Sequence, residues 1–480
     1  MSAIKRKWDN IPITAKVSIA YAACSILQRC VSFFTLPLFT RLLTTEQYGQ
    51  YVIYQSWEGI LCIFITLNLA YGSFSTAMVK FEKDRDGYIS AVEGICLAFS
   101  LAFLIIYLPL QVFWNKLFEL PTAFVCIMVA EILGSTAIQL WSGKKRFKFK
   151  YKSFVAVTLG MTIISPLLAY ILVANTSEKG YARILGYAII MILVGWVFYI
   201  MNAIRGKKML DKEYWKYALS FNIPLLAYYL SQVVFNQCDR IMISHMVGKD
   251  KAAIYGVTYS LATILIFVLN AINSSYVPWY YGKIKEGKPE ENRSISTGIA
   301  LLMAILLSGI IWYAPEIIKI MAAPEYLEAV YVVPPVAVSI LLLLYSQFFI
   351  NVEFYYEEKM KLVWASIGSA VLNVILNWIF IKIMGFVAAA YTTLASYILF
   401  ALANYFAMTK LLKKRDLQDC AYNYRWLLII FAAFCAATVG AALLYPHLII
   451  RIVITAVVLV IIIIKRKALL SFYKTIKGKS

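Results

Sequence analysis

The chain of 480 residues contains few charged side chains. Asp, Glu, Lys and Arg make up only 15% of it, whereas hydrophobic residues make up 62% and the mean hydropathy is +0.74. Soluble domains carry roughly 25% charged residues, so neither an ordinary globular protein nor a disordered chain fits this composition. The length is sufficient for a dozen or more membrane-spanning helices of roughly 20 residues each, joined by short loops.

Motifs that carry catalysis are also missing. No GxxxxGK[ST] phosphate-binding loop occurs, so the chain has no visible means of using ATP. His245 and His447 are the only histidines, which argues against a His-based metal centre or a Ser-His-Asp site. The eight cysteines form no CxxC pair and resemble small hydrophobic side chains. We therefore expect no enzyme activity, no cofactor and no metal.

Long apolar segments predict an all-α integral membrane protein with about fourteen transmembrane helices. The predicted spans are residues 16–39, 50–78, 89–113, 120–141, 153–174 and 182–204, then 217–247, 253–280, 295–313, 330–352, 363–384 and 387–409, and finally 426–445 and 448–464. This order predicts an N-terminal lobe over residues 1–210, a C-terminal lobe over 211–412, and a helix pair with a basic tail over 413–480.

The two lobes show a faint internal repeat. Gly49-Gln50-Tyr51 with Ser56 opens the second helix of the first lobe, and Ala253-Ile254-Tyr255 with Ser260 opens the second helix of the other. Six helices in each lobe would give both the same orientation in the membrane.

Positive charge is distributed unevenly over the loops. Most of the 46 Lys and Arg residues fall in alternate loops, beginning with the N-terminus. Because cytoplasmic loops are enriched in Lys and Arg, we expect both termini to be cytoplasmic. The strongest anchor is the basic loop at residues 143–152, which we interpret as a topology determinant rather than a lipid-headgroup site. Glu93 is predicted near a cytoplasmic helix end, where its side chain could reach water.

Five charged residues lie deep in the predicted spans, namely Arg29, Glu58, Glu131, Asp239 and Arg240. A charge in hydrocarbon costs from about 2.5 to more than 10 kcal/mol, so each needs a partner, a hydrated cavity or a function. On the functional interpretation, Arg29 and Arg240 line a hydrated cavity that receives an anion. On the structural interpretation, Arg29 pairs with Glu58 or Glu131, and Asp239 pairs with Arg240 or with another helix. Glu58 and Glu131 could also bind coupling protons.

Several stretches resemble bacterial polysaccharide transporters, the Wzx-type lipid-linked oligosaccharide flippases of the multidrug/oligosaccharidyl-lipid/polysaccharide exporter superfamily. They begin at Leu36, Met78, Leu140, Tyr214 and Gly385, and read LPLFTRLLTTEQYGQY, MVKFEKDRDGYIS, LWSGKKRFKFKYK, YWKYALSFNIPLLAYYLSQVVFNQCDRIMISHMVG and GFVAAAYTTLASY. They extend across both lobes.

The resemblance implies a V-shaped fold of two six-helix lobes around a central cavity, with a further helix pair beside them. It also implies alternating-access export of undecaprenyl-diphosphate-linked oligosaccharides for a surface polysaccharide such as capsule or O-antigen. Arg29 matches the basic position of the first helix, and Asp239-Arg240 match the DR pair of the seventh. Relatives often carry a His near the FNIP segment, where this chain has Ala227, so a role for that His is not implied.

The sequence leads to a lipid-linked oligosaccharide flippase of the bacterial cell membrane, working with membrane lipids and a polysaccharide polymerase and not with nucleic acid. A cation-coupled multidrug exporter of the same superfamily is the alternative, because Glu58, Glu131 and Asp239 would suit cationic substrates. A sugar-transferring membrane enzyme would need a catalytic carboxylate in an outer loop. Glu316, Glu325 and Glu328 lie in the longest of these, where we expect ordinary solvated carboxylates.

Overall fold

The computed structural model describes residues 13–358, 360–415 and 421–464, and over these ranges the chain is helical, without a strand. It divides into two compact units, Met1–Ala253 and Ile254–Ser480. The basic residues before position 13 and the basic tail at 465–480, both part of the topology prediction, lie outside the described residues.

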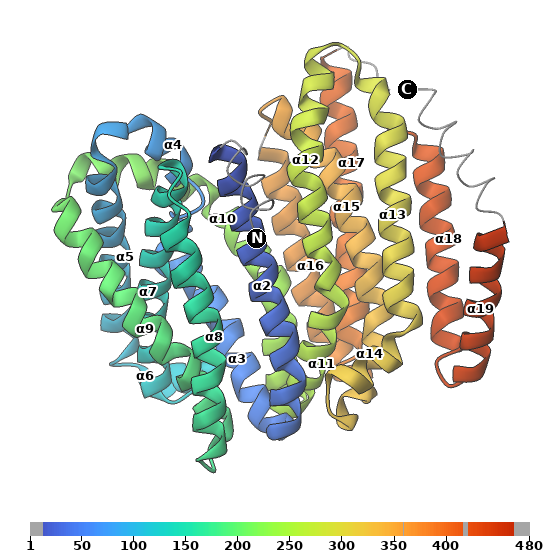
Figure 1. Ribbon diagram of the computed structural model, residues 1–480, viewed down its shortest axis with the longest axis horizontal. Coiled ribbons are helices and arrows are strands. Elements are labelled where there is room, and N and C mark those ends of the chain that lie inside the picture. Colours follow the sequence, from blue (N-terminus) through green and yellow to red (C-terminus); the bar gives the residue numbers. More distant parts are fainter. Residues whose placement is uncertain (1–12, 359, 416–420, 465–480) are drawn as a thin grey trace, which may run out of the picture. The chain divides into compact units, whose positions relative to one another are not determined.

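The first unit is a bundle of long helices (Figure 1). In chain order it contains α2 (Ile13–Leu42), α3 (Thr45–Thr66), α4 (Phe74–Lys80), the 3₁₀ turn η1 (Glu82–Asp84), α5 (Arg85–Tyr107), α6 (Gln111–Phe118), α7 (Thr122–Phe147), α8 (Lys152–Ala174), α9 (Lys179–Gly206) and α10 (Lys212–Met246). Helix α11 (Lys249–Ala262) crosses into the second unit.

The second unit has the same all-helical construction (Figure 1). After the 3₁₀ turn η2 (Thr263–Leu265) it contains α12 (Ile266–Lys285), η3 (Pro289–Glu291), α13 (Asn292–Trp312), α14 (Ala314–Met321), η4 (Pro324–Val332), α15 (Val333–Tyr355), α16 (Met360–Met384), α17 (Ala388–Lys414), α18 (Tyr424–Leu443) and α19 (Leu448–Ile464).

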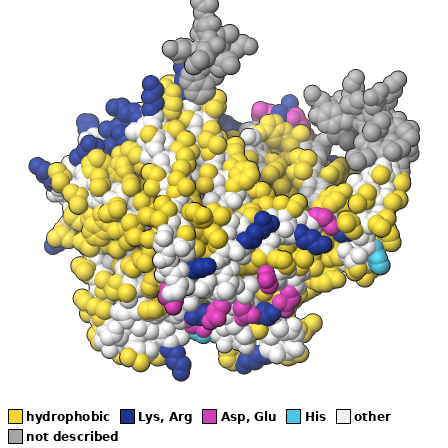
Figure 2. Space-filling model, turned by 60° about the horizontal axis from the view of Figure 1, so that its bottom comes forward, with side chains coloured by type: hydrophobic (Ala, Val, Ile, Leu, Met, Phe, Trp, Pro, Cys, Tyr) yellow, Lys and Arg dark blue, Asp and Glu magenta, His cyan; other side chains and the backbone are white. Residues whose placement is uncertain are grey.

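Twelve helical segments of the described chain are long and apolar enough to cross a membrane. The expected number of fourteen is not confirmed, because α3 is not among the twelve and α19 is described as apolar only over Leu448–Val457. Large hydrophobic side chains such as Val112, Leu193 and Ile105 are strongly exposed, and Figure 2 shows hydrophobic side chains over much of one face. Such a surface is stable in lipid rather than in water.

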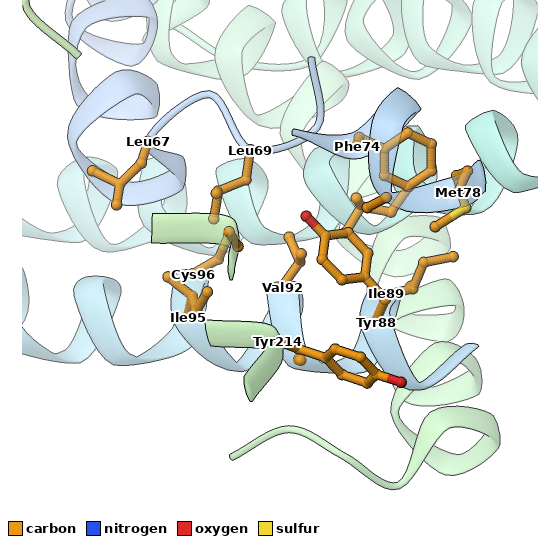
Figure 3. Close-up of a cluster of buried hydrophobic side chains, with 14 of the residues drawn as sticks. Leu67, Leu69, Phe74, Met78, Tyr88, Ile89, Val92, Ile95, Cys96 and Tyr214 are labelled. Carbon is orange, nitrogen blue, oxygen red and sulfur yellow. The ribbon is translucent and has the colours of Figure 1, made fainter. Parts of the chain in front are cut away.

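The predicted helix over residues 50–78 is wrong, because the chain turns after Thr66. Leu67 and Asn68 adopt left-handed backbone conformations, with φ of 47° and 55°, and a new helix starts at Phe74. Leu67 and Leu69 are buried in a cluster with Phe74 and residues of α5 (Figure 3). Burial of these side chains fixes a turn that hydropathy could not reveal.

Asp84 ties the start of α5 to the start of α10. Its carboxylate accepts hydrogen bonds from Gly87 N (3.0 Å), Lys208 Nζ (2.7 Å) and the Tyr214 hydroxyl (2.8 Å). The hydrogen bond to Asp84 raises the pKa of Lys208. Helix α10 therefore packs in the first unit. The lobe boundary predicted at 210/211 refers to the two repeated halves of the sequence, and it stays a prediction.

Small residues allow close helix contacts in the first unit. A Cβ on Gly195 of α9 would clash with Cα of Gly134 on α7, so the two backbones touch. On α9, Gly186 meets Ala169 of α8 in the same way. Helices in lipid associate through such close packing, because burial of apolar surface supplies no net drive there.

In the second unit, a buried ion pair fastens the last helix pair. Arg451 of α19 is almost fully buried and binds both carboxylate oxygens of Glu316 on α14, each at 2.7 Å. The Thr455 hydroxyl accepts hydrogen bonds from Trp312 Nε1 and the Tyr313 hydroxyl. The pairing with Arg451 holds the pKa of Glu316 below its usual range.

We expect Glu316→Gln to lower the free energy of unfolding by about 3 kcal/mol, because it leaves the buried Arg451 charge without its counter-charge. Since the folded pKa of Glu316 is depressed, this stabilisation is present above the unfolded pKa and lost as the pH falls through the folded one. Thermal unfolding of the purified protein at neutral and acidic pH measures both effects.

The exposed Glu325 in the neighbouring segment is the matched control. Glu325→Gln should unfold at the wild-type temperature. If Glu316→Gln unfolds at the same temperature as this control, the ion pair does not fasten the last helix pair.

Candidate functional site

Arg29 and Glu58 lie at the same depth in the first unit. Arg29 precedes the end of α2 by thirteen residues, and Glu58 follows the start of α3 by thirteen. At 1.5 Å per residue, each is about 20 Å from the turn that joins the two helices. Thr44 closes this turn with a capping box, in which its hydroxyl accepts from Gln47 N and Gln47 reaches back to Thr44 N. The α2–α3 hairpin therefore carries a cation and an acid at one level.

Glu58 and Glu131 form an acidic pair inside the first unit. Their carboxyl groups lie near enough to repel each other when both are ionised. Glu131 of α7 is buried and accepts a hydrogen bond of 2.8 Å from the hydroxyl of Tyr54, one turn before Glu58 on α3. Two acids that the sequence places 73 positions apart thus come near each other in the first unit.

Arg240 of α10 is linked to α3 through the side-chain amide of Gln237. Its Nη1 donates to the backbone oxygen of Asn236 at 2.9 Å and to Oε1 of Gln237 at 2.7 Å. That Gln237 oxygen also accepts from the Ser56 hydroxyl of α3 at 3.4 Å. Asp239, by contrast, is buried. The structure thus attaches Arg240 to α3 within one helical turn of Glu58.

All five predicted site residues lie in the first unit, on α2, α3, α7 and α10. Arg29 itself is exposed. Within the described ranges, neither Glu58 nor Glu131 forms an ion pair, so the predicted pairing of Arg29 with either acid is not formed. The two acids lie near enough to influence each other, and the arginine is exposed.

Arg183, a buried arginine near the start of α9, was not among the predicted site residues. Its guanidinium lies over the rings of Tyr51 (3.7 Å), Tyr48 (4.2 Å) and Phe39 (4.6 Å), and Nη2 donates to the Tyr48 hydroxyl at 3.2 Å. Nε and Nη1 have no hydrogen-bond partner in the described chain. Aromatic faces attract a desolvated cation. Arg183 is the second residue of the predicted span 182–204, so it was not counted among the deep charges.

Glu93 also differs from its prediction. It is not at a water-exposed helix end but buried in α5, where one carboxyl oxygen accepts from Asn202 Nδ2 at 2.8 Å. Asn202 donates to the backbone oxygen of Ala137 as well, so Glu93 joins α5, α7 and α9. This arrangement is typical of a structural contact.

The three outer-loop acids considered for an enzyme have different surroundings. Glu316 is committed to Arg451 by two hydrogen bonds, and Glu325 and Glu328 are exposed. No group of three or more His, Cys, Asp or Glu side chains that could hold a metal ion occurs among the described residues.

Parts of the chain match the models of two protein families. Residues 14–281 match the family described as polysaccharide biosynthesis protein, and residues 224–379 match the family MatE. "Lsg locus putative protein 1" of Haemophilus influenzae is 22% identical over 369 residues, which cover 75% of this chain and 89% of that protein. An "uncharacterized membrane protein" of the same species is 24% identical over 287 residues, covering 57% and 66%.

Comparisons with solved structures identify the fold. The lipid II flippase MurJ in an inward closed conformation matches with a TM-score of 0.61 at 15% identity, covering 95% of this chain and 100% of MurJ. A multidrug resistance MATE family transporter in an inward-facing conformation matches with a TM-score of 0.58 at 13% identity, covering 80% and 96%. At these identities the likeness shows a shared fold and does not select a substrate.

The hydrogen bond between Tyr54 and Glu131 makes a direct prediction. Tyr54→Phe leaves a buried carboxyl oxygen without its donor, so we expect the free energy of unfolding to fall by about 1 to 3 kcal/mol. Thermal unfolding in detergent measures this loss.

Tyr71→Phe is the control, because Tyr71 is strongly exposed and removal of its hydroxyl should have no effect. Equal unfolding temperatures for the two variants would contradict the proposed hydrogen bond.

Proposed function

Because the chain belongs to the polysaccharide biosynthesis protein family, we propose that it is a flippase for undecaprenyl-diphosphate-linked oligosaccharides. It would carry them from the inner to the outer leaflet by alternating access, for a surface polysaccharide such as capsule or O-antigen. The family membership and the fold shared with a lipid II flippase support this proposal.

Such a substrate poses a defined physical problem. Each unpaired hydroxyl or phosphate group placed in hydrocarbon costs several kcal/mol, whereas the polyprenyl tail is stable there. A protein that moves the headgroup must therefore offer polar and cationic groups at mid-membrane depth while leaving the tail in lipid.

Arg29 is the observation that carries the proposal. Its side chain is exposed, and it lies near the middle of a helix about 45 Å long. An exposed guanidinium at this depth is costly in lipid and favourable beside an anion. A diphosphate supplies that anion, and Arg240, only partly exposed, is the second candidate contact.

The remaining assignments are parts of the same proposal. Asp239 would orient the substrate-binding segment of α10, and Glu58 and Glu131 would take up a coupling ion. Both termini would be cytoplasmic in the inner membrane of a bacterium, with a polysaccharide polymerase as partner. An inside-negative membrane potential favours outward movement of an anion by about 2.3 kcal/mol per charge per 100 mV, which helps set the direction.

We expect Arg29→Gln to reduce export of surface polysaccharide by at least tenfold, because a hydrogen bond to a charged group contributes about 1.5 to 3 kcal/mol. Arg29→Lys should retain part of the activity, since it keeps the charge but not the fork of donors. The measurement is polymer at the cell surface of a strain that depends on this chain, normalised to protein in the membrane.

Arg41→Gln, in the last turn of the same helix, is the control. Normal export by Arg29→Gln at normal protein levels would reject the cationic-contact proposal.

A second candidate function is a cation-coupled multidrug exporter. The acidic pair of Glu58 and Glu131 favours it, because buried carboxyl groups suit cationic substrates and protons. The match of residues 224–379 to MatE and the fold shared with a MATE transporter also support it.

The exporter makes a different prediction in a drug-sensitive host. There, the wild-type chain would raise resistance to a lipophilic cationic dye several-fold, and Glu58→Gln would remove that resistance by deleting the charge. Growth in graded dye concentrations measures both. Restored polysaccharide export without dye resistance would reject the exporter.

A further inference from the structure

The first unit contains a cavity that none of the predicted site residues lines. It has a volume of about 300 Å³ and lies among α2, α7, α8 and α9. Most of the side chains around it carry a hydroxyl or amide group, and none is charged. A second cavity, of about 470 Å³ in the other unit, is lined mainly by apolar residues. The polar lining is thus a particular property of the first cavity.

The polar groups converge from all four helices. Gln28, Ser32 and Thr35 follow one another at the spacing that places side chains on one face of α2. Gln139 of α7 and Thr162 of α8 also line the cavity. Such convergence of hydroxyl and amide groups is what a binding site for a polar, uncharged group requires.

Hydrogen bonding leaves this lining open to a ligand. The hydroxyls of Ser32 and Thr162 donate to backbone oxygens one turn earlier on their own helices, which leaves oxygen lone pairs free to accept. The side-chain amides of Gln28 and Gln139 have no hydrogen-bond partner in the described part of the chain. Both side chains are exposed, and an amide at membrane depth is costly without a partner, so the cavity suits water or a polar ligand.

The size and the mixed lining point to a sugar ring. A volume of 300 Å³ corresponds to about ten water molecules at liquid density, which is enough for a ring with its hydroxyls. Met161, Met191 and Pro166 supply apolar surface for the C–H face of the ring, while the hydroxyls and amides suit its rim. A lining without charge offers no preference for phosphate or for a lipophilic cation.

We propose that this cavity binds a neutral sugar ring of the lipid-linked oligosaccharide, separately from the diphosphate, which Arg29 contacts. The inference rests on the proposed flippase function and adds a site for the carbohydrate itself. Gln28 and Gln139 donate to sugar hydroxyls, and the Ser and Thr oxygens accept from them.

Binding of two lipids to the full-length chain in nanodiscs tests this site. The probes are undecaprenyl diphosphate without sugar, and lipid-linked oligosaccharide extracted from cells that make the polysaccharide. The double variant Gln28→Leu/Gln139→Leu should bind the oligosaccharide lipid about tenfold more weakly, because two hydrogen bonds are lost. Its affinity for undecaprenyl diphosphate should stay within about twofold of wild type, since Arg29 is untouched.

A matched pair of serines on α2 tests occupancy of the cavity. Ser25 and Ser32 are both exposed and both donate to a backbone oxygen four residues earlier, but only Ser32 lines the cavity. Ser32→Phe should therefore weaken binding of the oligosaccharide lipid selectively, and Ser25→Phe should not.

The outcomes separate this inference from the function on which it rests. If wild-type protein binds both lipids and the cavity variants leave their affinity ratio unchanged, the sugar site is rejected while the flippase proposal stands. An equal loss for both lipids would also reject it, because that result indicates a structural role. If wild-type protein binds neither lipid, the proposed function itself fails.

Discussion

The cost of placing charge in hydrocarbon is the constraint on which this structure depends. Only a small fraction of the chain is charged, since leaving a charge unaided in lipid costs several kcal/mol. The most informative case is the α2–α3 hairpin, which holds Arg29 and Glu58 at one level. Opposite charges so placed could cancel, yet the charge that acts on Glu58 is that of the acid Glu131.

Two buried cations near helix starts show what a structural role looks like. Arg451 is buried and bidentate with Glu316, and Arg183 is buried against aromatic rings. Both guanidinium groups are enclosed by their own unit. Arg29 is exposed, and Arg240 is partly so. On the proposed function, this difference in accessibility separates the cations that contact the substrate from those that hold helices together.

On the proposed function, the diphosphate and the sugar of the substrate are bound at separate places. The diphosphate requires positive charge, whereas sugar rings require hydroxyl and amide groups with some apolar surface. The first unit offers both kinds of surface, with the cation on α2 and the uncharged cavity among α2, α7, α8 and α9. Separate contacts would let one lipid carrier be recognised in common and its sugars selectively.

Hydropathy and charge, which depend only on local composition, were enough to predict an all-helical membrane protein. Their limits appear where helices are internal rather than lipid-facing. Helix α3 is too polar to count among the apolar spans, and its end at Thr66 is set by burial of Leu67 and Leu69. A hydropathy average over a window of residues includes both sides of such a turn and therefore cannot locate it.

For the site, the sequence by itself determined which charges lie deep in apolar segments, because a charge within a long hydrophobic run is visible in one dimension. Only the tertiary structure decided their partners. The meeting of Glu58 with Glu131, the enclosure of Arg183 and the burial of Glu93 all depend on contacts between helices distant in the chain. Such contacts follow from the packing of whole helix faces, which no local pattern of residues encodes.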